Sequence, residues 1–145
     1  MKTTDNTNTV VVDLSSDIQL KFDNATPKQR QDIAYKYIMD NLRGCYKATD
    51  GRIVSINKKS ADKLSHTPDE LKIRVTSSLA DAIEKAEFIG TATATHGKFD
   101  NFAYYQIIFN IGGKLYSGVI NVGILLREKS AVLYTVNQLT EINPN

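Results

Sequence analysis

The sequence predicts an α+β fold, in which N-terminal helices pack on a mostly antiparallel, four-stranded sheet. Two segments, 27–43 and 68–87, carry apolar residues at helical spacing. After Gly90 the pattern changes, and segments rich in β-branched and aromatic residues follow one another. Helices followed by a run of strands are typical of this fold class. The 145 residues suffice for one domain.

The first 25 residues are expected to form a flexible or extended arm ahead of a single domain over 26–145. The opening MKTTDNTNT is polar, whereas VVVDL and IQLKF are short apolar segments of the length of strands or of an extended arm. The first helix is expected to begin at Thr26, which can cap it, with Pro27 in the first helical position. Gly44 can end it.

The middle of the chain predicts a hairpin and two more helices. Asp50 and Gly51 form a turn signal between YKAT and RIVSI. Asn57 can cap a short helix, and Thr67 can form a capping box with Glu70 at the start of a long one. The apolar face of this long helix is expected to pack on the sheet through Leu71, Val75, Leu79 and Ile83.

The C-terminal part predicts three consecutive antiparallel strands around 103–111, 114–126 and 131–137. Gly112 and Gly113 supply the turn between the first two. The polar stretch 91–102 is a connection or an edge strand. Gly118 and Gly123, which lie inside a strand pattern, are expected to mark bulges or bends.

The composition excludes several classes of protein. No apolar run reaches the length of a membrane span, and the N-terminus lacks the core of a signal peptide. A single cysteine, Cys45, excludes an internal disulfide, and with two histidines a structural zinc site is not expected. No glycine pattern precedes a helix as in a dinucleotide site, so no cofactor is expected. The net charge of +2 permits a nucleic-acid partner without demanding one.

The stretch SINKKSADKLSH places three basic side chains on one side of the predicted short helix. Lys59 and Lys63 are four residues apart, and His66 follows three later. Two cations at this spacing repel each other slightly in an isolated helix, so helix stability does not explain them. Either an anion binds between them or the face is simply solvated, and the local sequence leaves both open.

The order of motifs from about Gly51 to Leu139 resembles the phage-borne branch of the barnase–EndoU–colicin–RelE (BECR) nucleases. Its matching features are GRIVSINKKSADKL, the following amphipathic helix, a polar segment with a histidine, the hairpin IIFNIGGKLYSGVINV and the closing strand LYTV. Such domains occur as C-terminal toxins of phage head-morphogenesis (MuF-type) proteins. The resemblance implies an RNA-cleaving toxin that needs no metal and leaves a 2′,3′-cyclic phosphate.

Such a reaction requires a base for the ribose 2′-hydroxyl, cations for the phosphate and an acid for the leaving oxygen. Histidine titrates nearest neutral pH, which suits His96 to acid–base work, although a loop histidine without a role is the alternative. The remaining catalytic candidates follow from the resemblance, each with a packing or capping role as its alternative. The catalytic set is His96, Lys63, Ser60, Tyr134 and Thr135.

A second group of residues suits substrate binding. Aromatic faces stack unpaired bases while lysines hold phosphates, as the recognition of single-stranded RNA requires. Alternation along a strand places Tyr104 and Tyr105 on opposite faces, so at most one of them faces a ligand. His66 directly precedes a helix cap, which also favours a local structural role. The candidate binding residues are Lys59, His66, Lys98, Tyr104 and Lys114.

The function hypotheses therefore fall into three classes. The first is an endoribonuclease toxin that acts in the cytoplasm after delivery by a phage or a secretion system. Its expected partners are RNA, with tRNA among the candidates, and a cognate immunity or antitoxin protein, but no membrane. The second is a phage accessory or inhibitor protein that binds nucleic acid or protein without catalysis. The third is an adaptor that acts through its N-terminal arm.

Overall fold

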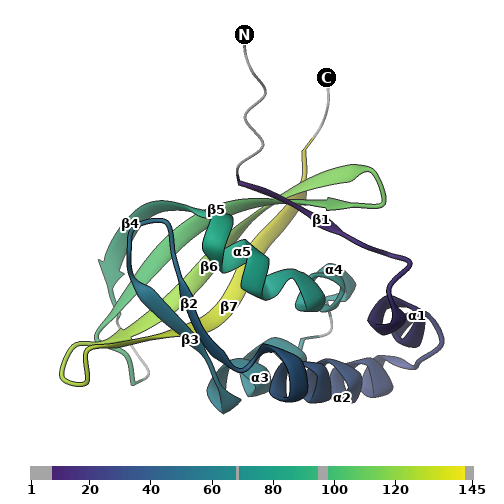
Figure 1. The fold of residues 1–145 in the computed structure, drawn as a ribbon, viewed down its shortest axis with the longest axis horizontal. Helices are drawn as coiled ribbons and strands as arrows, with labels where there is room; N and C mark the ends of the chain where they lie inside the picture. Colours follow the sequence, from purple (N-terminus) through teal and green to yellow (C-terminus); the bar gives the residue numbers. More distant parts are fainter. Residues whose placement is uncertain (1–7, 68, 95–97, 143–145) are drawn as a thin grey trace, which may run out of the picture.

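The structure, a computed structural model, describes residues 8–67, 69–94 and 98–142. In these residues, helices cover one face of a curled mixed sheet (Figure 1), which confirms the α+β class. The strands are β1 (Thr9–Val12), β2 (Gly44–Lys47), β3 (Ile53–Ile56), β4 (Glu87–Thr93), β5 (Asn101–Ile111), β6 (Lys114–Leu125) and β7 (Ser130–Glu141). The helices are α1 (Asp17–Asp23), α2 (Pro27–Tyr37), α3 (Lys58–Ser65), α4 (Glu70–Arg74) and α5 (Leu79–Lys85).

Strands β4, β5, β6 and β7 form an antiparallel meander, in which each strand pairs with the next along the chain. The three predicted C-terminal strands and their antiparallel order are therefore confirmed. Gly112 and Gly113 make the turn between β5 and β6 with φ angles of 61° and 87°, a region that glycine adopts without strain. The polar stretch that begins at Thr91 contributes the end of edge strand β4.

The sheet is larger than the four strands expected, because β1, β3 and β2 extend the meander at its two sides. Strand β1 runs parallel to the second half of β5, and β3 meets β7 in parallel at Ser55 and Val132. Strand β2 then pairs with β3 across the predicted turn, where Gly51 has a φ of 92°. Across the described residues, seven strands thus share one sheet.

The segment IQLKF is a helix, not a strand or an extended arm. Ile18 and Phe22 are four residues apart, so a helix places both on one face, where they pack in a small cluster with Ala34 and Ile73. Both side chains are buried. The segment VVVDL contributes strand β1, one of its two expected conformations. Val10 and Val12 of this strand belong to the main core.

Helix α2 begins as its sequence predicts. The Thr26 side chain accepts a hydrogen bond from the backbone N–H of Gln29, the Gln29 side chain accepts one from the backbone N–H of Thr26, and Pro27 follows the cap. A π-helical turn, Ile38–Leu42, continues the helix to the start of β2. The expected helix over 27–43 is therefore confirmed apart from its last residue.

The expected long helix over 68–87 is broken into α4, a 3₁₀ turn (Thr76–Ser78) and α5. The break falls at Thr76, Ser77 and Ser78, whose hydroxyls compete with the helical backbone for hydrogen bonds. The N-cap of α4 is Asp69 rather than Thr67, since its carboxylate accepts from the N–H groups of the first turn. Pro68 lies outside the described residues.

The main core lies between α5 and the covered face of the sheet. Three of the four helix residues expected there, Val75, Leu79 and Ile83, are buried in it, whereas Leu71 is only half-buried. Tyr105 points into the same core and Tyr104 to the opposite face, as strand alternation predicts. No helix in the described ranges combines the length and apolar character needed to cross a membrane.

Candidate functional site

A cavity of about 600 Å³ lies where α3 and α4 meet the uncovered face of the meander. Five of the predicted site residues line it together: Lys63, His66, Tyr104, Tyr134 and Thr135. The other polar lining residues are Asp62, Thr67, Lys72, Thr93, Asn121 and Asn137. The structure therefore brings together side chains from two helices and four strands, and the outermost of them, Asp62 and Asn137, are 75 residues apart in the chain.

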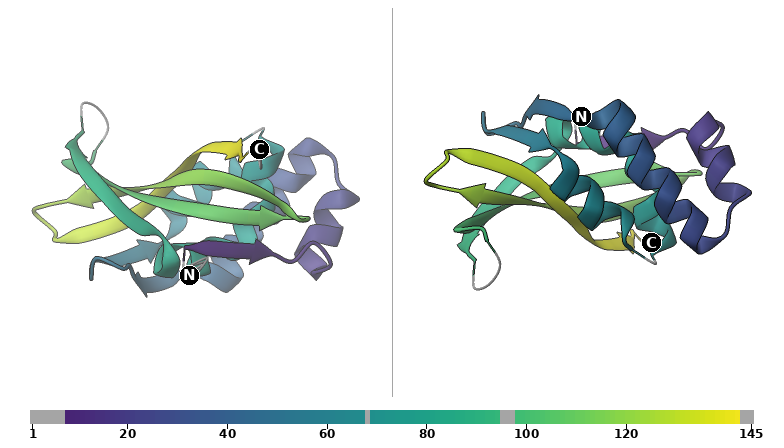
Figure 2. Two further views of the ribbon diagram at one scale, coloured as in Figure 1. Left: turned by 90° about the horizontal axis from the view of Figure 1, so that it is seen from above. Right: turned by 90° about the horizontal axis from the view of Figure 1, so that it is seen from below.

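Helix α3 is fixed beside β7 by its first turn (Figure 2, right). The Asn57 side chain caps it by accepting from the N–H groups of Lys59 and Ser60, as predicted. The Ser60 hydroxyl donates to the carbonyl oxygen of Leu133 at 2.6 Å and accepts from the Asn57 N–H. It thereby joins α3 to β7, on the same edge of the strand where β3 pairs at Val132.

This geometry corrects the catalytic assignment of Ser60. The side chain is fully buried, and its hydroxyl is already engaged on both sides. It cannot reach a phosphate in the cavity without giving up the bond to β7. The capping alternative is the role that the structure shows, and the same bond sets the position of Lys63 one turn later.

His66 follows the last turn of α3 as its C-cap. Its Nδ1 lies 2.5 Å from the carbonyl oxygen of Asp62. A carbonyl only accepts hydrogen bonds, so Nδ1 carries the proton in this contact. In the neutral ring, the other nitrogen, Nε2, then carries the lone pair that can accept a hydrogen bond. The exposed imidazole is thus held in one orientation at the cavity wall.

A β-bulge explains how two consecutive residues of β7 face the same cavity. Thr135 pairs with Asn121 and Leu133 with Val122, which leaves Tyr134 as an extra residue without a partner on β6. Regular alternation would send Tyr134 and Thr135 to opposite faces. Bulges re-aim side chains in this way and are common next to binding sites. Both residues therefore line the cavity, although Thr135 is almost fully buried.

A second hollow of about 470 Å³ adjoins the first and shares Asp62, Lys63, Phe102 and Tyr134 with it. Lys59, Lys98 and Phe99 also line it. Three rings form a cluster at its base: the ring centres of Phe99 and Phe102 are 5.6 Å apart, those of Phe99 and Tyr134 5.6 Å, and those of Phe102 and Tyr134 5.4 Å. We call these three residues the aromatic cluster.

Two lysines of α3 lie over this cluster. Lys63 Nζ is 4.9 Å from the centre of the Tyr134 ring, and Lys59 Nζ is 6.0 Å from that of Phe99. Both distances permit cation–π attraction. The predicted common face of the short helix therefore carries its lysines toward aromatic rings, with His66 at its end.

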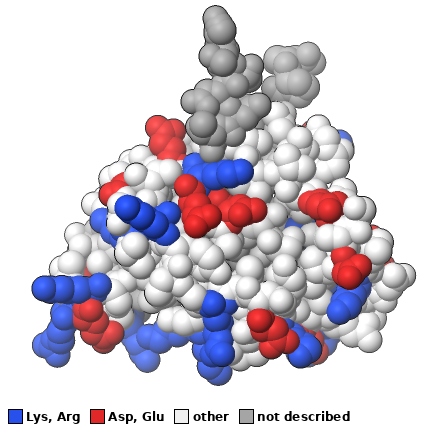
Figure 3. Space-filling model, in the orientation of Figure 1, with Lys and Arg blue, Asp and Glu red and all other residues white. Residues whose placement is uncertain are grey.

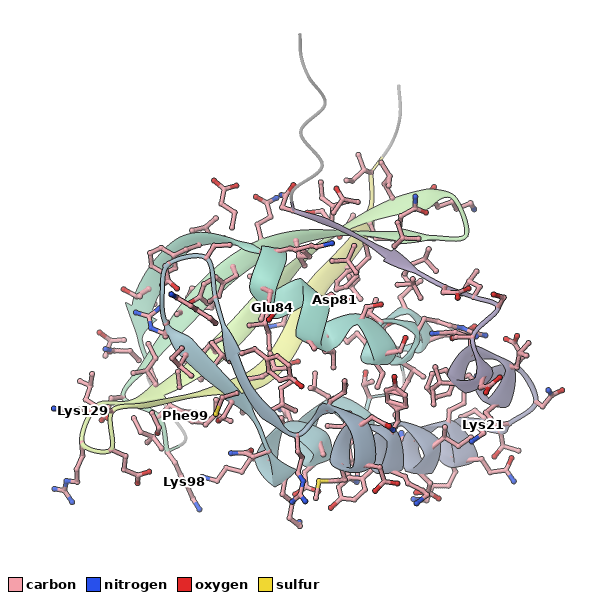
Figure 4. All side chains as sticks on the ribbon, viewed as in Figure 1. Lys21, Asp81, Glu84, Lys98, Phe99 and Lys129 are labelled. Carbon is pink, nitrogen blue, oxygen red and sulfur yellow. The ribbon has the colours of Figure 1, made fainter. Side chains whose placement is uncertain are left out.

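The loop that carries Lys98 and Phe99 is tied to the end of β6, near the turn with Lys129 (Figure 4). The Asp100 N–H donates to the carbonyl of Ile124 at 2.8 Å, and its carboxylate accepts from the N–H of Leu126 at 2.8 Å. Gly123 makes room for the ring, because a Cβ there would lie 2.6 Å from Phe99. Close packing is thus the role of Gly123, whereas Gly118 lies at a register shift as expected.

The two hollows carry a strong excess of positive charge. Lys59, Lys63, Lys72 and Lys98 line them against one carboxylate, that of Asp62. Asp62 is paired with Lys58 at 3.0 Å and, by this hydrogen bond and its charge, raises the pKa of Lys58.

Within the described part of the chain, none of the four lining lysines forms an ion pair. A group of Lys and Arg side chains is visible at the lower left of the molecule (Figure 3). An anion is the ligand that such an arrangement favours.

Two predicted residues do not join this site. Lys114 begins β6 at the glycine turn, seven residues and so roughly 23 Å along the strand from Asn121. Lys114 does not line these hollows, and its role in substrate binding stays a prediction. His96 lies outside the described residues, and its catalytic role stays a prediction.

The sequence reasoning missed Lys72, Asn121 and Asn137, as well as the aromatic pair Phe99 and Phe102. One signal for Asn121 was present, because asparagine is depleted in strands and this one interrupts the apolar run of β6. Its Oδ1 is buried and has no hydrogen-bond donor among the described residues.

As for metals, the described residues contain no group of three or more His, Cys, Asp and Glu side chains placed to hold an ion. The polar groups that line the cavity are ammonium groups, an imidazole, hydroxyls, amides and the carboxylate of Asp62. Between them, these groups bind anions and exchange protons.

The family model for large polyvalent protein-associated domain 3 matches residues 25–131, about three quarters of the chain. The chain belongs to this family. No curated protein and no solved structure matches it. The matched residues of this chain include α3, α4 and the loop with Lys98, and they end just before the bulge at Tyr134. Membership agrees with the phage-associated setting suggested by the sequence, and it leaves the nuclease assignment as a proposal.

Proposed function

We propose that this domain is an endoribonuclease that cleaves RNA without a metal and leaves a 2′,3′-cyclic phosphate. The observation that carries the proposal is the shared cavity of Lys63 and His66. There, an ammonium group that forms no ion pair among the described residues lines the same cavity as an imidazole whose Nδ1 is held by a carbonyl oxygen. Binding of an anion and transfer of a proton, which this reaction needs at one place, are thus available within one cavity.

Lys63 and Lys72 are the residues suited to hold the scissile phosphate. They come from α3 and α4 and line the same cavity, so a phosphate between them meets charge from two sides. Ammonium groups are point charges on flexible stems, which follow the phosphate as its charge builds up in the transition state. Thr135 and Tyr134 add hydroxyl groups on the opposite wall.

The reaction moves one proton in and one out. The 2′-hydroxyl gives its proton to a base as its oxygen bonds to phosphorus, and the 5′-oxygen takes a proton from an acid as its bond to phosphorus breaks. Nε2 of His66 suits one of these roles. His96 and the Tyr134 hydroxyl are the candidates for the other.

The order of elements supports the resemblance to BECR nucleases. Strand β3 leads directly into the helix with Ser60 and Lys63, and the antiparallel meander β4–β7 follows the helices. On this proposal the domain acts on RNA in the cytoplasm as a phage-borne toxin, with tRNA among its candidate substrates and an immunity protein as its inhibitor. Among the described residues the sheet has seven strands, more than the four of that resemblance.

A second candidate function is binding of nucleic acid without cleavage. The aromatic cluster with Lys59 and Lys63 over its rings favours it, because stacking and phosphate contacts suffice for binding. This candidate shares every contact with the first, except that it needs no proton transfer at His66.

The test is incubation of the purified protein with total RNA and with tRNA in the presence of chelator, followed by analysis of the fragment ends. We expect fragments with 2′,3′-cyclic phosphates from the wild type, and far fewer from His66→Gln. The matched control, Lys114→Gln, alters a lysine far from the cavity and should cut like the wild type. RNA that is bound but stays intact would favour the second candidate. Cleavage that stops in chelator would reject the mechanism.

A further inference from the structure

A third hollow, of about 540 Å³, adjoins the central cavity on the side away from the lysines, so that the three hollows form one groove. It shares Tyr104, Asn121 and Asn137 with the central cavity. Its other walls are Ile89, Gly90, Thr91 and Val119. None of its lining residues is charged. A phosphate in this hollow would meet no cation, whereas a neutral planar group would find one aromatic and several apolar walls.

Three strands place their polar side chains in one row here. Tyr104 pairs with Asn121 between β5 and β6, and Asn121 pairs with Thr135 between β6 and β7. The ring of Tyr104 and the amide of Asn121 are therefore neighbours on the uncovered face, as directly opposed side chains are in an antiparallel pair. Tyrosine rings stack on unpaired bases, and amides bond to base edges.

The amide of Asn121 lacks a hydrogen bond to its oxygen. The Oδ1 atom is buried, and no donor reaches it from the described residues. A buried acceptor without a donor costs free energy, which a ligand N–H placed there would recover. Among the bases, adenine and cytosine present an exocyclic amino group next to a ring acceptor, which an asparagine amide engages with two hydrogen bonds.

We propose that this hollow is a base-recognition subsite, in which Tyr104 stacks on an unpaired adenine or cytosine and Asn121 reads its amino group. The inference rests on the proposed function, because it takes the anion at the lysines to be an RNA phosphate. One strand of RNA would then cross the groove, with phosphate contacts at Lys63 and Lys72 and base reading one nucleotide to the side. The substrate class is single-stranded RNA, since a paired base does not expose its face, and side chains cannot read base edges in the deep, narrow major groove of an RNA duplex.

The test measures binding of short, fluorescently labelled, single-stranded 2′-O-methyl oligonucleotides by anisotropy. These oligonucleotides lack the attacking hydroxyl, so binding is read independently of cleavage. Cytosine and uracil are both pyrimidines, but cytosine presents an amino group beside a ring acceptor where uracil presents a carbonyl oxygen beside a ring N–H, so their comparison tests the reading of this edge. We expect oligocytidine to bind about tenfold more tightly than oligouridine, and Asn121→Leu to abolish the difference by weakening the binding of oligocytidine.

The matched control is Gln106→Leu, which removes an exposed amide from the same strand face as Tyr104 but outside the three hollows. It should keep the preference. Equal binding of the two oligonucleotides by the wild type, or an unchanged preference in a folded Asn121→Leu protein, would overturn the inference. Cleavage without any base preference refutes this subsite and leaves the proposed function intact. A base preference without cleavage supports this subsite and refutes the proposed cleavage.

Discussion

The ammonium group of Lys63 lies 4.9 Å from the centre of the Tyr134 ring, and so joins the last turn of α3 to the bulge of β7. The two residues come from opposite ends of the cavity-forming sequence, and the fold brings them side by side. The Ser60 bond to Leu133 holds the same two elements together one turn earlier. Any movement of α3 along β7 would therefore move the charge away from the ring.

Removal of the Lys63 charge should separate catalysis from folding. We expect Lys63→Met, which keeps most of the side-chain length, to lower the cleavage rate about 10²–10³-fold, because one electrostatic contact to the transition state is lost. The melting temperature should change little, since the side chain is exposed. Single-turnover cleavage and thermal melting measure the two effects. Lys114→Met is the control, and an equal rate loss in both variants would contradict the assignment.

The two histidines should differ in their effect on the pH dependence of cleavage. If His66 exchanges a proton in the reaction, His66→Gln should lose one limb of the pH–rate profile, because a glutamine amide does not titrate. His96→Gln, tested in parallel, shows whether the second limb belongs to that residue. A profile that keeps both limbs in His66→Gln would assign the proton transfers to other groups.

Ser60→Ala should affect stability rather than chemistry. The substitution leaves the carbonyl of Leu133 buried without its donor, which costs about 1–3 kcal/mol in the free energy of unfolding. Urea denaturation measures the loss, and cleavage by the folded fraction at low temperature should stay close to that of the wild type. A rate loss as large as that of Lys63→Met, with unchanged stability, would restore the catalytic role.

Gly123→Ala should displace the ring of Phe99. The new Cβ would lie 2.6 Å from the ring, closer than such atoms come, so the ring must leave the aromatic cluster. Loss of one stacking contact should weaken binding of single-stranded RNA by about 1–3 kcal/mol. Phe99→Leu should produce a similar loss, and the double variant no further one, because both remove the same contact. Additive losses measured by anisotropy would contradict this.

Tyr105 should make the fold sensitive to alkaline pH. Burial and the Asp50 carboxylate raise the pKa of Tyr105 to about 12, although Arg52 opposes the shift. The folded state therefore favours the neutral phenol, and this contribution is complete below about pH 10 and lost as the pH rises through about 12. Urea denaturation across this range should show a fall in wild-type stability of up to about 3 kcal/mol. Tyr105→Phe should reduce that slope, and an identical slope would contradict the argument.

Local signals predicted the elements that short-range chemistry determines. The capping box at Thr26, the cap at Asn57 and the glycine turn at 112–113 each satisfy backbone groups within a few residues, so their sequences suffice to identify them. The break of the helix at Thr76–Ser78 also has a local signal, three consecutive residues with hydroxyl groups. The apolar periodicity of Val75, Leu79 and Ile83 runs across these residues and concealed that signal.

The candidate site was predicted where residue chemistry alone is informative. Basic and aromatic residues such as Lys63, His66 and Tyr104 suggest anion and base binding wherever they lie. The burial of Ser60, by contrast, follows from a hydrogen bond to a strand 73 residues away. The bulge that turns Tyr134 toward Thr135 depends on the register of β6 and β7, and the sequence of either strand alone does not define that register.

Strand β1 has a consequence for the order in which the chain folds. It pairs with residues 108–111 of β5, 99 residues further along the chain. At about 5–20 residues per second, β1 leaves the ribosome roughly 5–20 s before its partner exists. During that time Val10 and Val12 have no sheet to join, and the meander can form without them. Closing so large a loop is slow, so β1 should dock last, and in pulse-labelled hydrogen exchange its amides should gain protection after those of β5 and β6.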